Sequence, residues 1–268
     1  MRYERYCERR APPRAPLSGL DPRLLLRGYA AGIFPMADSR EAGDIFWVEP
    51  RSRAILPLDR FHLSRSLARR VRSRRFVVTV DTAFGDVLGA CARRSETWIN
   101  EQIERATLGL HATGHAHSIE TWRDGTLVGG LYGVKLGGAF FGESMFSTET
   151  DASKVALAWL VARMKVGGFS LLDCQFMTGH LESLGAVTVS RERYGQLLSS
   201  ALGSRSTASA ARGGTSVTGG DAASAPDFFA LDGLLAERTG AADAAVAASA
   251  SLPGAPGQVI VQLLGHTS

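Results

Sequence analysis

The chain has little cysteine and no long apolar run, and each absence removes a class of protein. Its 268 residues include three cysteines, Cys7, Cys91 and Cys174. They are odd in number and far apart, so the pattern excludes a disulfide framework and a zinc site and favours a reducing compartment. No apolar run approaches the roughly 20 residues of a membrane span, and the Arg- and Pro-rich N-terminus lacks the apolar region of a secretory signal. We therefore expect a cytoplasmic protein with no membrane partner.

Familiar nucleotide and hydrolase motifs are also missing. There is no phosphate-binding P-loop and no dinucleotide fingerprint. The segment GESMF at 142–146 is not a Gly-x-Ser-x-Gly elbow, so Ser144 is not expected to be a nucleophile. His115 and His117 alternate as a strand-borne metal pair would, but no third ligand is evident, so we expect no metal and no cofactor.

Positive charge is concentrated in one short segment, although the formal net charge is only +4. The segment contains Arg65, Arg69, Arg70, Arg72, Arg74 and Arg75. Such a cluster can follow a phosphate backbone, and the alternative is a solvated helix face.

Composition divides the chain into four parts. We expect a disordered N-terminus (1–16), a small N-terminal lobe (17–60), a main α/β domain (61–202) and an Ala-, Gly- and Ser-rich extension (203–268). Most of the extension is typical of a flexible linker. Its apolar island at 226–236 can dock as a helix, and 259–264 has the composition of a strand.

Capping residues and apolar periodicity predict the elements of the body. Helices are expected to begin at Asp21, Ser64, Asp81, Asn100 and Ser190. Strands are expected at 76–80, 118–122, 127–136, 139–146, 169–175 and 187–189, with a long helix at 151–166 and a short one at 179–184.

This order predicts a mixed sheet of the α+β class. Three antiparallel strands pass through the helix at 151–166 into the strand at 169–175, and such a crossover makes the last two strands parallel. Ligands bind at the carboxyl ends of parallel strands where the topology switches. The candidate site therefore lies on residues 142–147 and 173–175.

Three polar residues in these segments could carry chemistry. Glu143 lies inside an apolar strand, where a carboxylate needs either a ligand or a structural partner such as an arginine. Strand alternation predicts that Asp173 and Gln175 share one face, where they could hold or relay a proton, with Cys174 on the other. The alternative is that Asp173 caps a turn and Gln175 is solvated.

The order of elements looks like the acetyltransferase fold that binds acyl-CoA, and this suggests one competing function. That fold usually holds the pyrophosphate on a Gly-rich loop before the crossover helix. Here the corresponding residues, 147–154, contain no glycine. A CoA-dependent N-acetyltransferase is therefore disfavoured, and a non-catalytic RNA-binding module is disfavoured by the acidic constellation, which phosphate binding does not need.

Taken together, the motifs resemble the leucyl/phenylalanyl-tRNA–protein transferase family. The matching segments span about 20 to 200: GIFP (32–35), SRSL (64–67), TWI (97–99), GHAHS (114–118), LVGGLYG (127–133), FGESMFS (141–147), DASK (151–154), LDCQ (172–175) and HLESLG (180–185). The resemblance implies an acetyltransferase-like (GNAT-type) catalytic domain. It also implies transfer of Leu or Phe, less well Met, from aminoacyl-tRNA to proteins that begin with Arg or Lys, which marks them for N-end rule degradation. Neither CoA nor a metal is implied, and we expect a monomer.

The resemblance also assigns roles to residues of this chain. An apolar pocket for the aminoacyl side chain would be formed by Leu131, Phe140, Met145, Leu157 and Leu172. Glu143 and Asp173 would flank the incoming Arg or Lys terminus, and Gln175 would orient or help deprotonate the attacking amine. Whether Gln175 or the ribose hydroxyl handles the proton stays open. Trp47 and Trp98 would stack on or enclose the terminal adenosine, and the arginine cluster would contact tRNA phosphates.

Overall fold

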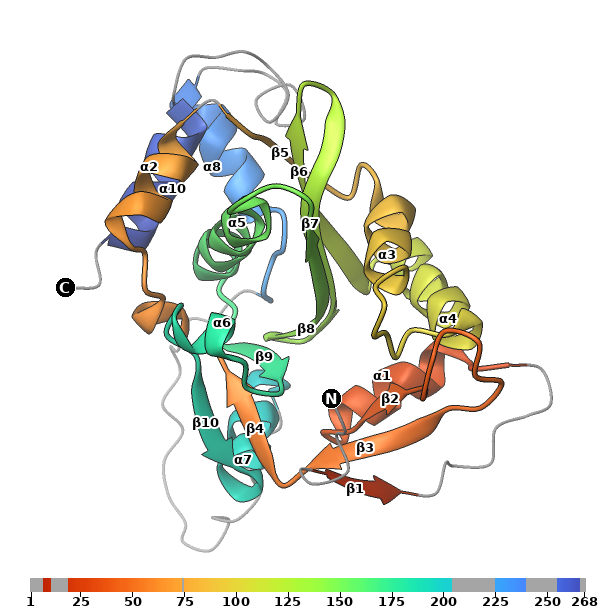
Figure 1. The fold of residues 1–268 in the computed structure, drawn as a ribbon. Helices are drawn as coiled ribbons and strands as arrows, with labels where there is room; N and C mark the ends of the chain where they lie inside the picture. The colour runs from red at the N-terminus through yellow and green to blue at the C-terminus, as the bar shows by residue number, and fades with distance from the viewer. Residues whose placement is uncertain (1–6, 11–18, 74, 204–224, 240–254, 266–268) are drawn as a thin grey trace, which may run out of the picture.

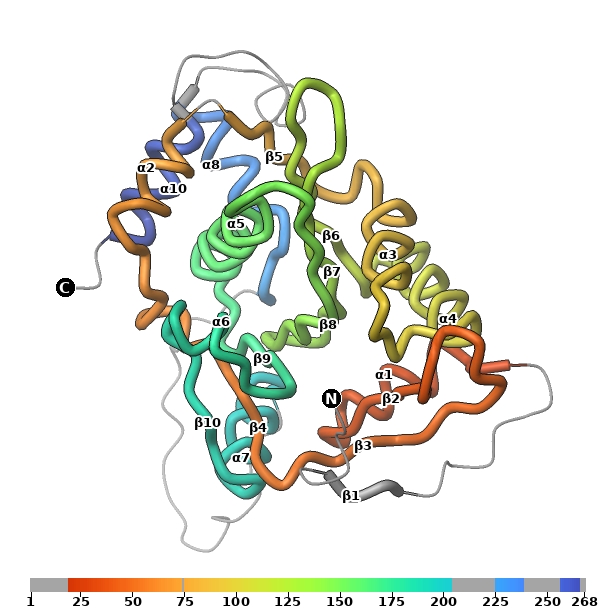
Figure 2. Tube along the Cα trace, viewed as in Figure 1, coloured from red at the N-terminus to blue at the C-terminus, as the bar shows by residue number. Residues whose placement is uncertain are grey.

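The computed structural model of the protein describes residues 7–10, 19–73, 75–203, 225–239 and 255–265. The elements are, in chain order, β1 (Cys7–Arg10), α1 (Pro22–Ala30), β2 (Phe34–Met36), β3 (Phe46–Pro50), β4 (Ser52–Ile55), the 3-10 helix η2 (Leu58–Arg60), α2 (Arg65–Arg72), β5 (Val77–Val80), α3 (Phe84–Ala92), α4 (Glu101–Ala112), β6 (Ala116–Arg123), β7 (Thr126–Leu136), β8 (Ala139–Ser147), α5 (Ala152–Val166), β9 (Leu171–Gln175), α6 (Gly179–Glu182), β10 (Val187–Ser190), α7 (Arg191–Ala201), α8 (Ala230–Thr239) and α10 (Ala255–Gly265). Helices cover both faces of a large central sheet (Figures 1 and 2).

The central sheet has seven strands in the order β10-β4-β9-β8-β7-β6-β5. Strands β8 and β9 are parallel and every other neighbouring pair is antiparallel. The predicted α+β class, the meander and the crossover through α5 are therefore confirmed. No helix among the described residues is both long and apolar enough to cross a bilayer.

Two expectations about the N-terminal region are wrong. Strand β4 was placed in the N-terminal lobe, but it pairs with β9 and β10 and so belongs to the central sheet. Residues 7–10 were expected to be disordered, but they form β1, which pairs with β3 in the three-stranded sheet β1-β3-β2. The rest of the segment 1–16 lies outside the described residues.

Most of the predicted helix starts are confirmed by their capping bonds. The side chains of Asp21, Ser64, Asn100 and Ser190 each accept a backbone N–H in the first turn of α1, α2, α4 and α7. Asp81 is the exception. It has a φ of 55°, and its carboxylate binds the Ser118 amide at 2.8 Å and the His117 ring at 2.7 Å instead of capping α3.

Alternation along the central strands divides the apolar side chains between two cores. On one face, Leu131 and Phe140 pack with α5, α2, α8 and α10. On the other face, Tyr132 and Phe141 pack with α1, α3, α4 and α7. Successive residues of β7 and β8 thus serve opposite layers, as the two-residue period of a strand requires.

The C-terminal extension packs on the α5 face of the sheet. Phe228 is fully buried, with its ring centroid 4.3 Å from that of His117 and 5.5 Å from that of Phe140. Arg163, which is 1% exposed, forms an ion pair with Asp232 at 2.6 Å. The docking of the island at 226–236 is therefore confirmed. The strand predicted at 259–264 is wrong, because these residues belong to α10, which packs its apolar face on α2 and α5.

Replacing Phe228 by Ala tests whether this packing stabilises the body. Removal of a fully buried aromatic ring costs about 3–5 kcal/mol when the site cannot collapse. We expect the free energy of unfolding in urea to fall by about that amount. The neighbouring Phe229 is 46% exposed, so Phe229→Ala should change it by under about 1 kcal/mol. Equal effects of the two substitutions would show that the extension is not anchored through Phe228.

Candidate functional site

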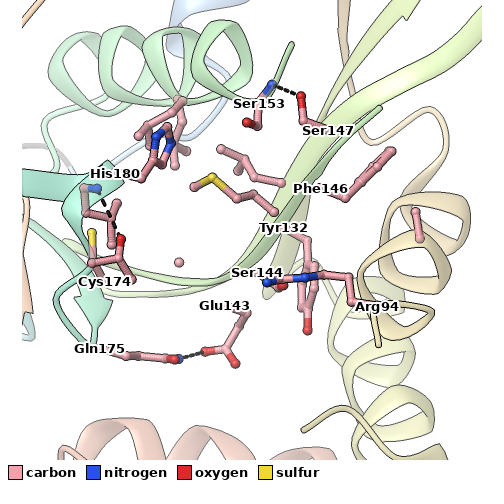
Figure 3. A pocket seen from close by; sticks show the side chains of 18 of the residues that line it. Arg94, Tyr132, Glu143, Ser144, Phe146, Ser147, Ser153, Cys174, Gln175 and His180 are labelled. Carbon is pink, nitrogen blue, oxygen red and sulfur yellow. Dashed lines mark hydrogen bonds between the residues drawn. The ribbon is translucent and has the colours of Figure 1, made fainter. Parts of the chain in front are cut away.

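Strands β8 and β9 separate at the predicted edge of the sheet. Their parallel pairing begins with Ala139 beside Leu171 and ends with Phe141 beside Asp173. Beyond that point a cavity of about 1440 Å³ opens between the strand ends, the first turn of α5, the short helix α6 and the end of α3 (Figure 3). The topology thus places residues 142–147 and 174–175 around one space, as the sequence predicted.

One wall of the cavity is apolar. It includes four of the five residues expected in the aminoacyl pocket, together with two further leucines: Leu131, Met145, Leu157, Leu172, Leu160 and Leu181. Phe140 is not a lining residue, so its assignment to the pocket is wrong. It is fully buried against Phe228, because alternation turns it into the core beneath α5.

Glu143 enters the cavity from a β-bulge. Gly142 pairs with Gly133 and Ser144 pairs with Tyr132, so Glu143 is an extra residue that has no partner on β7. A bulge redirects the side chain of the strand locally. This explains how a carboxylate within an apolar strand reaches the cavity rather than the core.

The carboxylate of Glu143 is buried and held by two hydrogen-bond donors. It is 7% exposed, it accepts a 2.7 Å bond from Gln175 Nε2, and it also accepts one from the Tyr29 hydroxyl. Burial raises the pKa of Glu143 to about 8, and the hydrogen bonds only partly oppose this rise. The group therefore titrates near neutral pH and can exchange a proton there.

Gln175 has a left-handed backbone at the end of β9. Its φ is 62°, and its amide donates a 2.8 Å bond to Asp173 Oδ1. A non-glycine residue in this region is held there by its surroundings, and such residues cluster at functional sites. Cys174 and Gln175 both line the cavity, and Asp173 does not. Cys174 packs against the α5-side core, whereas Asp173 bonds Tyr194 of the opposite core and Gln175 bonds Glu143. The predicted placement of Cys174 opposite Asp173 is therefore confirmed, but Asp173 is fully buried and does not reach the cavity.

Asp173 is instead locked by Arg53. The two side chains are 0% and 2% exposed, and Arg53 Nε and Nη2 lie 2.9 Å and 2.6 Å from the two carboxylate oxygens. The Tyr194 hydroxyl donates a third bond at 2.8 Å. Burial alone would lower the Arg53 pKa, but the nearby charges and hydrogen bond, led by the charge of Asp173, together outweigh it and raise the pKa. With all its bonds satisfied, Asp173 cannot contact an incoming N-terminus and acts as a positioning residue for Gln175.

The two tryptophans expected at the adenosine lie in different surroundings. Trp98 lines the cavity. Trp47 is 1% exposed, and a Cβ added at Gly28 would lie 2.1 Å from its ring. Trp47 therefore fills the core of the N-terminal lobe, and its assignment to the adenosine site is wrong.

The arginine cluster has two kinds of member. Arg70 lies 3.6 Å from Asp151 and Arg75 lies 2.9 Å from Glu149, so both are neutralised in part. Within the described residues, Arg65, Arg69 and Arg72 form no ion pair or hydrogen bond through their guanidinium groups. These three line a groove of about 620 Å³ between η2, α2 and α10. Arg74 lies outside the described residues.

Comparison with known proteins gives one consistent result. The model of the leucyl/phenylalanyl-tRNA protein transferase family matches residues 55–199, and that of its N-terminal domain matches 19–51. The chain belongs to the leucyl/phenylalanyl-tRNA–protein transferase family. A leucyl/phenylalanyl-tRNA–protein transferase of Rhizorhabdus wittichii is 60% identical over 94% of this chain and 100% of its own length. One of Novosphingobium aromaticivorans is 51% identical over 93% of this chain and 97% of its own length.

A solved structure, that of L-PGS from Bacillus licheniformis, is more distant. It is 14% identical and covers 58% of this chain and 53% of its own, with a TM-score of 0.35. A likeness of this size assigns no fold. The family resemblance inferred from the motifs is confirmed by the family models and the two relatives, and the chain is a transferase.

In this transferase family member, sequence reasoning missed Arg53, Tyr29 and Tyr194. Of these three residues, only Arg53 could have been recognised from the sequence as a candidate. It lies on a strand that continues into the apolar residues Ala54, Ile55 and Leu56. A charge in such a position needs a buried partner. The described residues contain no group of three or more His, Cys, Asp or Glu arranged to hold a metal ion.

Proposed function

We propose that this protein transfers Leu or Phe, and less well Met, from aminoacyl-tRNA to proteins that begin with Arg or Lys, so that these proteins enter N-end rule degradation. The observation that carries the proposal is a largely apolar cavity with the buried carboxylate Glu143 at its edge, in a chain of this family. The separated ends of β8 and β9 and the glycine-free loop at 147–154 are consistent with a GNAT-like domain that uses an acyl donor other than CoA. The donor and acceptor place the reaction in the cytoplasm, and we propose that a monomer carries it out.

The donor is held by shape and by desolvation. The aminoacyl side chain packs against the apolar wall formed by Leu131, Met145, Leu157 and Leu172. A charged side chain is excluded there because it would lose its hydration without gaining a partner. Trp98 encloses the terminal adenosine from the opposite side. The ester is already activated, so holding it beside an amine accounts for much of the rate.

Glu143 handles the proton of the acceptor. An α-ammonium has a pKa of roughly 7.7–8.0. Because burial raises the pKa of Glu143 to about 8, transfer of a proton from the ammonium to its carboxylate is nearly balanced in free energy. The free amine then forms a bond to the ester carbon, the bond to the ribose oxygen breaks, and the second proton of the nitrogen passes to that oxygen.

Gln175 and Asp173 position the groups that carry out this step. The amide of Gln175 donates to Glu143 and is not basic, so it orients the carboxylate rather than deprotonating the amine. Asp173 holds the Gln175 backbone in its left-handed conformation, and Arg53 holds Asp173. The catalytic assignment therefore narrows to Glu143, with Gln175 as its hydrogen-bond partner.

The tRNA body would lie along α2. Arg65, Arg69 and Arg72 face the groove without a partner among the described residues, whereas Arg70 and Arg75 already pair with acids.

Replacing Arg69 and Arg72 together by Gln should weaken tRNA binding about tenfold and reduce the slope of log affinity against log salt by about 1 to 2. The variant Arg70→Gln with Arg75→Gln loses the same charge and should lose less affinity. Equal losses would mean that only net charge matters.

The direct test supplies charged tRNA and an acceptor together. Phe-tRNA or Leu-tRNA is incubated with the full-length protein and a peptide that begins with Arg, and mass spectrometry measures the added residue. A matched peptide that begins with an acetylated Arg lacks the nucleophile and should not react. Acetylation of the peptide from acetyl-CoA, without aminoacyl transfer, would overturn the proposal in favour of an N-acetyltransferase.

A further inference from the structure

The segment between α3 and α4 places two consecutive arginines on the cavity wall. Arg93 and Arg94 both line the cavity and are exposed. Their guanidinium groups form no hydrogen bond or ion pair with any residue that the structure describes. The acidic residues that line the same cavity are Asp86 and Glu143, and Glu143 is assigned to the acceptor.

The two arginines point in different directions. Nη1 of Arg93 lies back over α3, 3.2 Å from where a Cβ of Gly89 would be. The Arg94 side chain extends into the cavity in the direction of Ser144 and Tyr132 (Figure 3). The end of the Arg94 side chain lies near Ser144, on the bulged segment of β8 (Figure 3). Arg94 is therefore the cation that reaches the cavity interior.

The surroundings of Arg94 fit a nucleotide. Trp98 follows it by four residues, and Trp122 and Phe146 line the same cavity. Aromatic rings stack on bases, and a guanidinium binds a phosphate through paired hydrogen bonds. A cation without a partner among the described residues, in the same cavity as rings that can stack, can take the phosphate of a nucleotide whose base stacks on a ring.

We propose that Arg94 binds a phosphate group that links the last nucleotides of the donor's 3′ end. The identity of the donor rests on the function proposed above. The tRNA is then held at two separate places, by its body along α2 and by its 3′ strand at the α3–α4 segment. The second contact fixes the ester relative to Glu143.

Binding of short probes tests the site without any transfer reaction. The trinucleotide CpCpA carries internucleotide phosphates, whereas adenosine carries none. Isothermal titration calorimetry with the full-length protein should show that Arg94→Gln weakens CpCpA about tenfold and leaves adenosine within twofold. The slope of log affinity for CpCpA against log salt should fall by about 0.7, the value for one phosphate of a single strand. Arg105→Gln, on the exposed face of α4, is the matched control and should change neither.

Transfer kinetics separate this site from the proposed function. With Phe-tRNA, Arg94→Gln should raise KM about tenfold and change kcat less than twofold, whereas with phenylalanyl-adenosine both should stay at the wild-type values. Unchanged CpCpA binding, or equal loss of CpCpA and adenosine, would overturn the phosphate site. Selective loss of CpCpA binding in a protein that transfers no amino acid would support the site and overturn the transferase proposal.

Discussion

Replacing Arg53 by Met is expected to lower the free energy of unfolding by about 3–5 kcal/mol, because it leaves the charge of Asp173 buried and unpaired. The Asp173 side chain is 0% exposed, and Arg53 supplies its only cationic partner within the described residues. Arg53 also lies between the rings of Phe34 and Tyr194, 4.6 Å from each centroid, so Met keeps part of the packing. Urea unfolding measures the loss, and transfer activity should fall because Gln175 loses its support.

Two variants show whether charge, rather than volume, is responsible. Adding Asp173→Asn to Arg53→Met removes the stranded charge and should restore part of the stability, since the Asn oxygen can still accept from the Gln175 amide and its Nδ2 can donate to the Tyr194 hydroxyl. Arg105→Met removes an exposed arginine, whose ion pair with Glu101 at 3.8 Å should contribute little. If Arg53→Met costs no more than Arg105→Met, the buried pair does not hold the site together.

Local patterns predicted the elements and their order. Asp21, Ser64 and Asn100 mark helix starts because a cap bonds within its own first turn. Likewise Asp124-Gly125, with φ of 50° and 76°, makes the tight turn between β6 and β7. Strand order then placed Glu143 and Gln175 around one cavity without any knowledge of distant contacts.

Features that depend on distant residues were missed. Arg53 and Asp173 are 120 residues apart, so no periodicity links them. The bulge at Glu143 is set by how β8 pairs with β7, and alternation alone does not show that Asp173 is buried away from the cavity. Trp47 shows the same limit, because only its packing against Gly28 distinguishes a core ring from a stacking surface.

Glu143→Gln is expected to lower kcat/KM about 100- to 10,000-fold, the range for loss of a positioned general base. Gln preserves the shape and a hydrogen-bond acceptor for Tyr29 but cannot take a proton. In the wild type, kcat/KM should rise with pH towards about 8 as Glu143 and the acceptor ammonium lose protons, and in the variant only the part due to the ammonium should remain. The kinetics are measured with Phe-tRNA and an Arg-starting peptide from pH 6 to 9. A loss under tenfold, with a pH profile identical to that of the wild type, would assign the proton to the ribose hydroxyl instead.

The same carboxyl makes stability depend on pH, which gives a test that needs no substrate. Its pKa is about 8 in the folded protein and 4.5 as the ordinary value, so between these limits the folded state binds the proton more tightly. The stabilisation is therefore complete below about pH 4.5 and is lost as pH rises towards 8, by at most about 1.4 kcal/mol per pH unit. Urea unfolding at pH 5, 6 and 7 should show this loss in the wild type and a flatter profile in Glu143→Gln.

At pH 7 most of the free protein then carries a protonated Glu143, and an arriving cationic N-terminus favours the ionised form. The acceptor thus helps to create the base that deprotonates it, which is a physical reason for placing an acid in a largely apolar cavity.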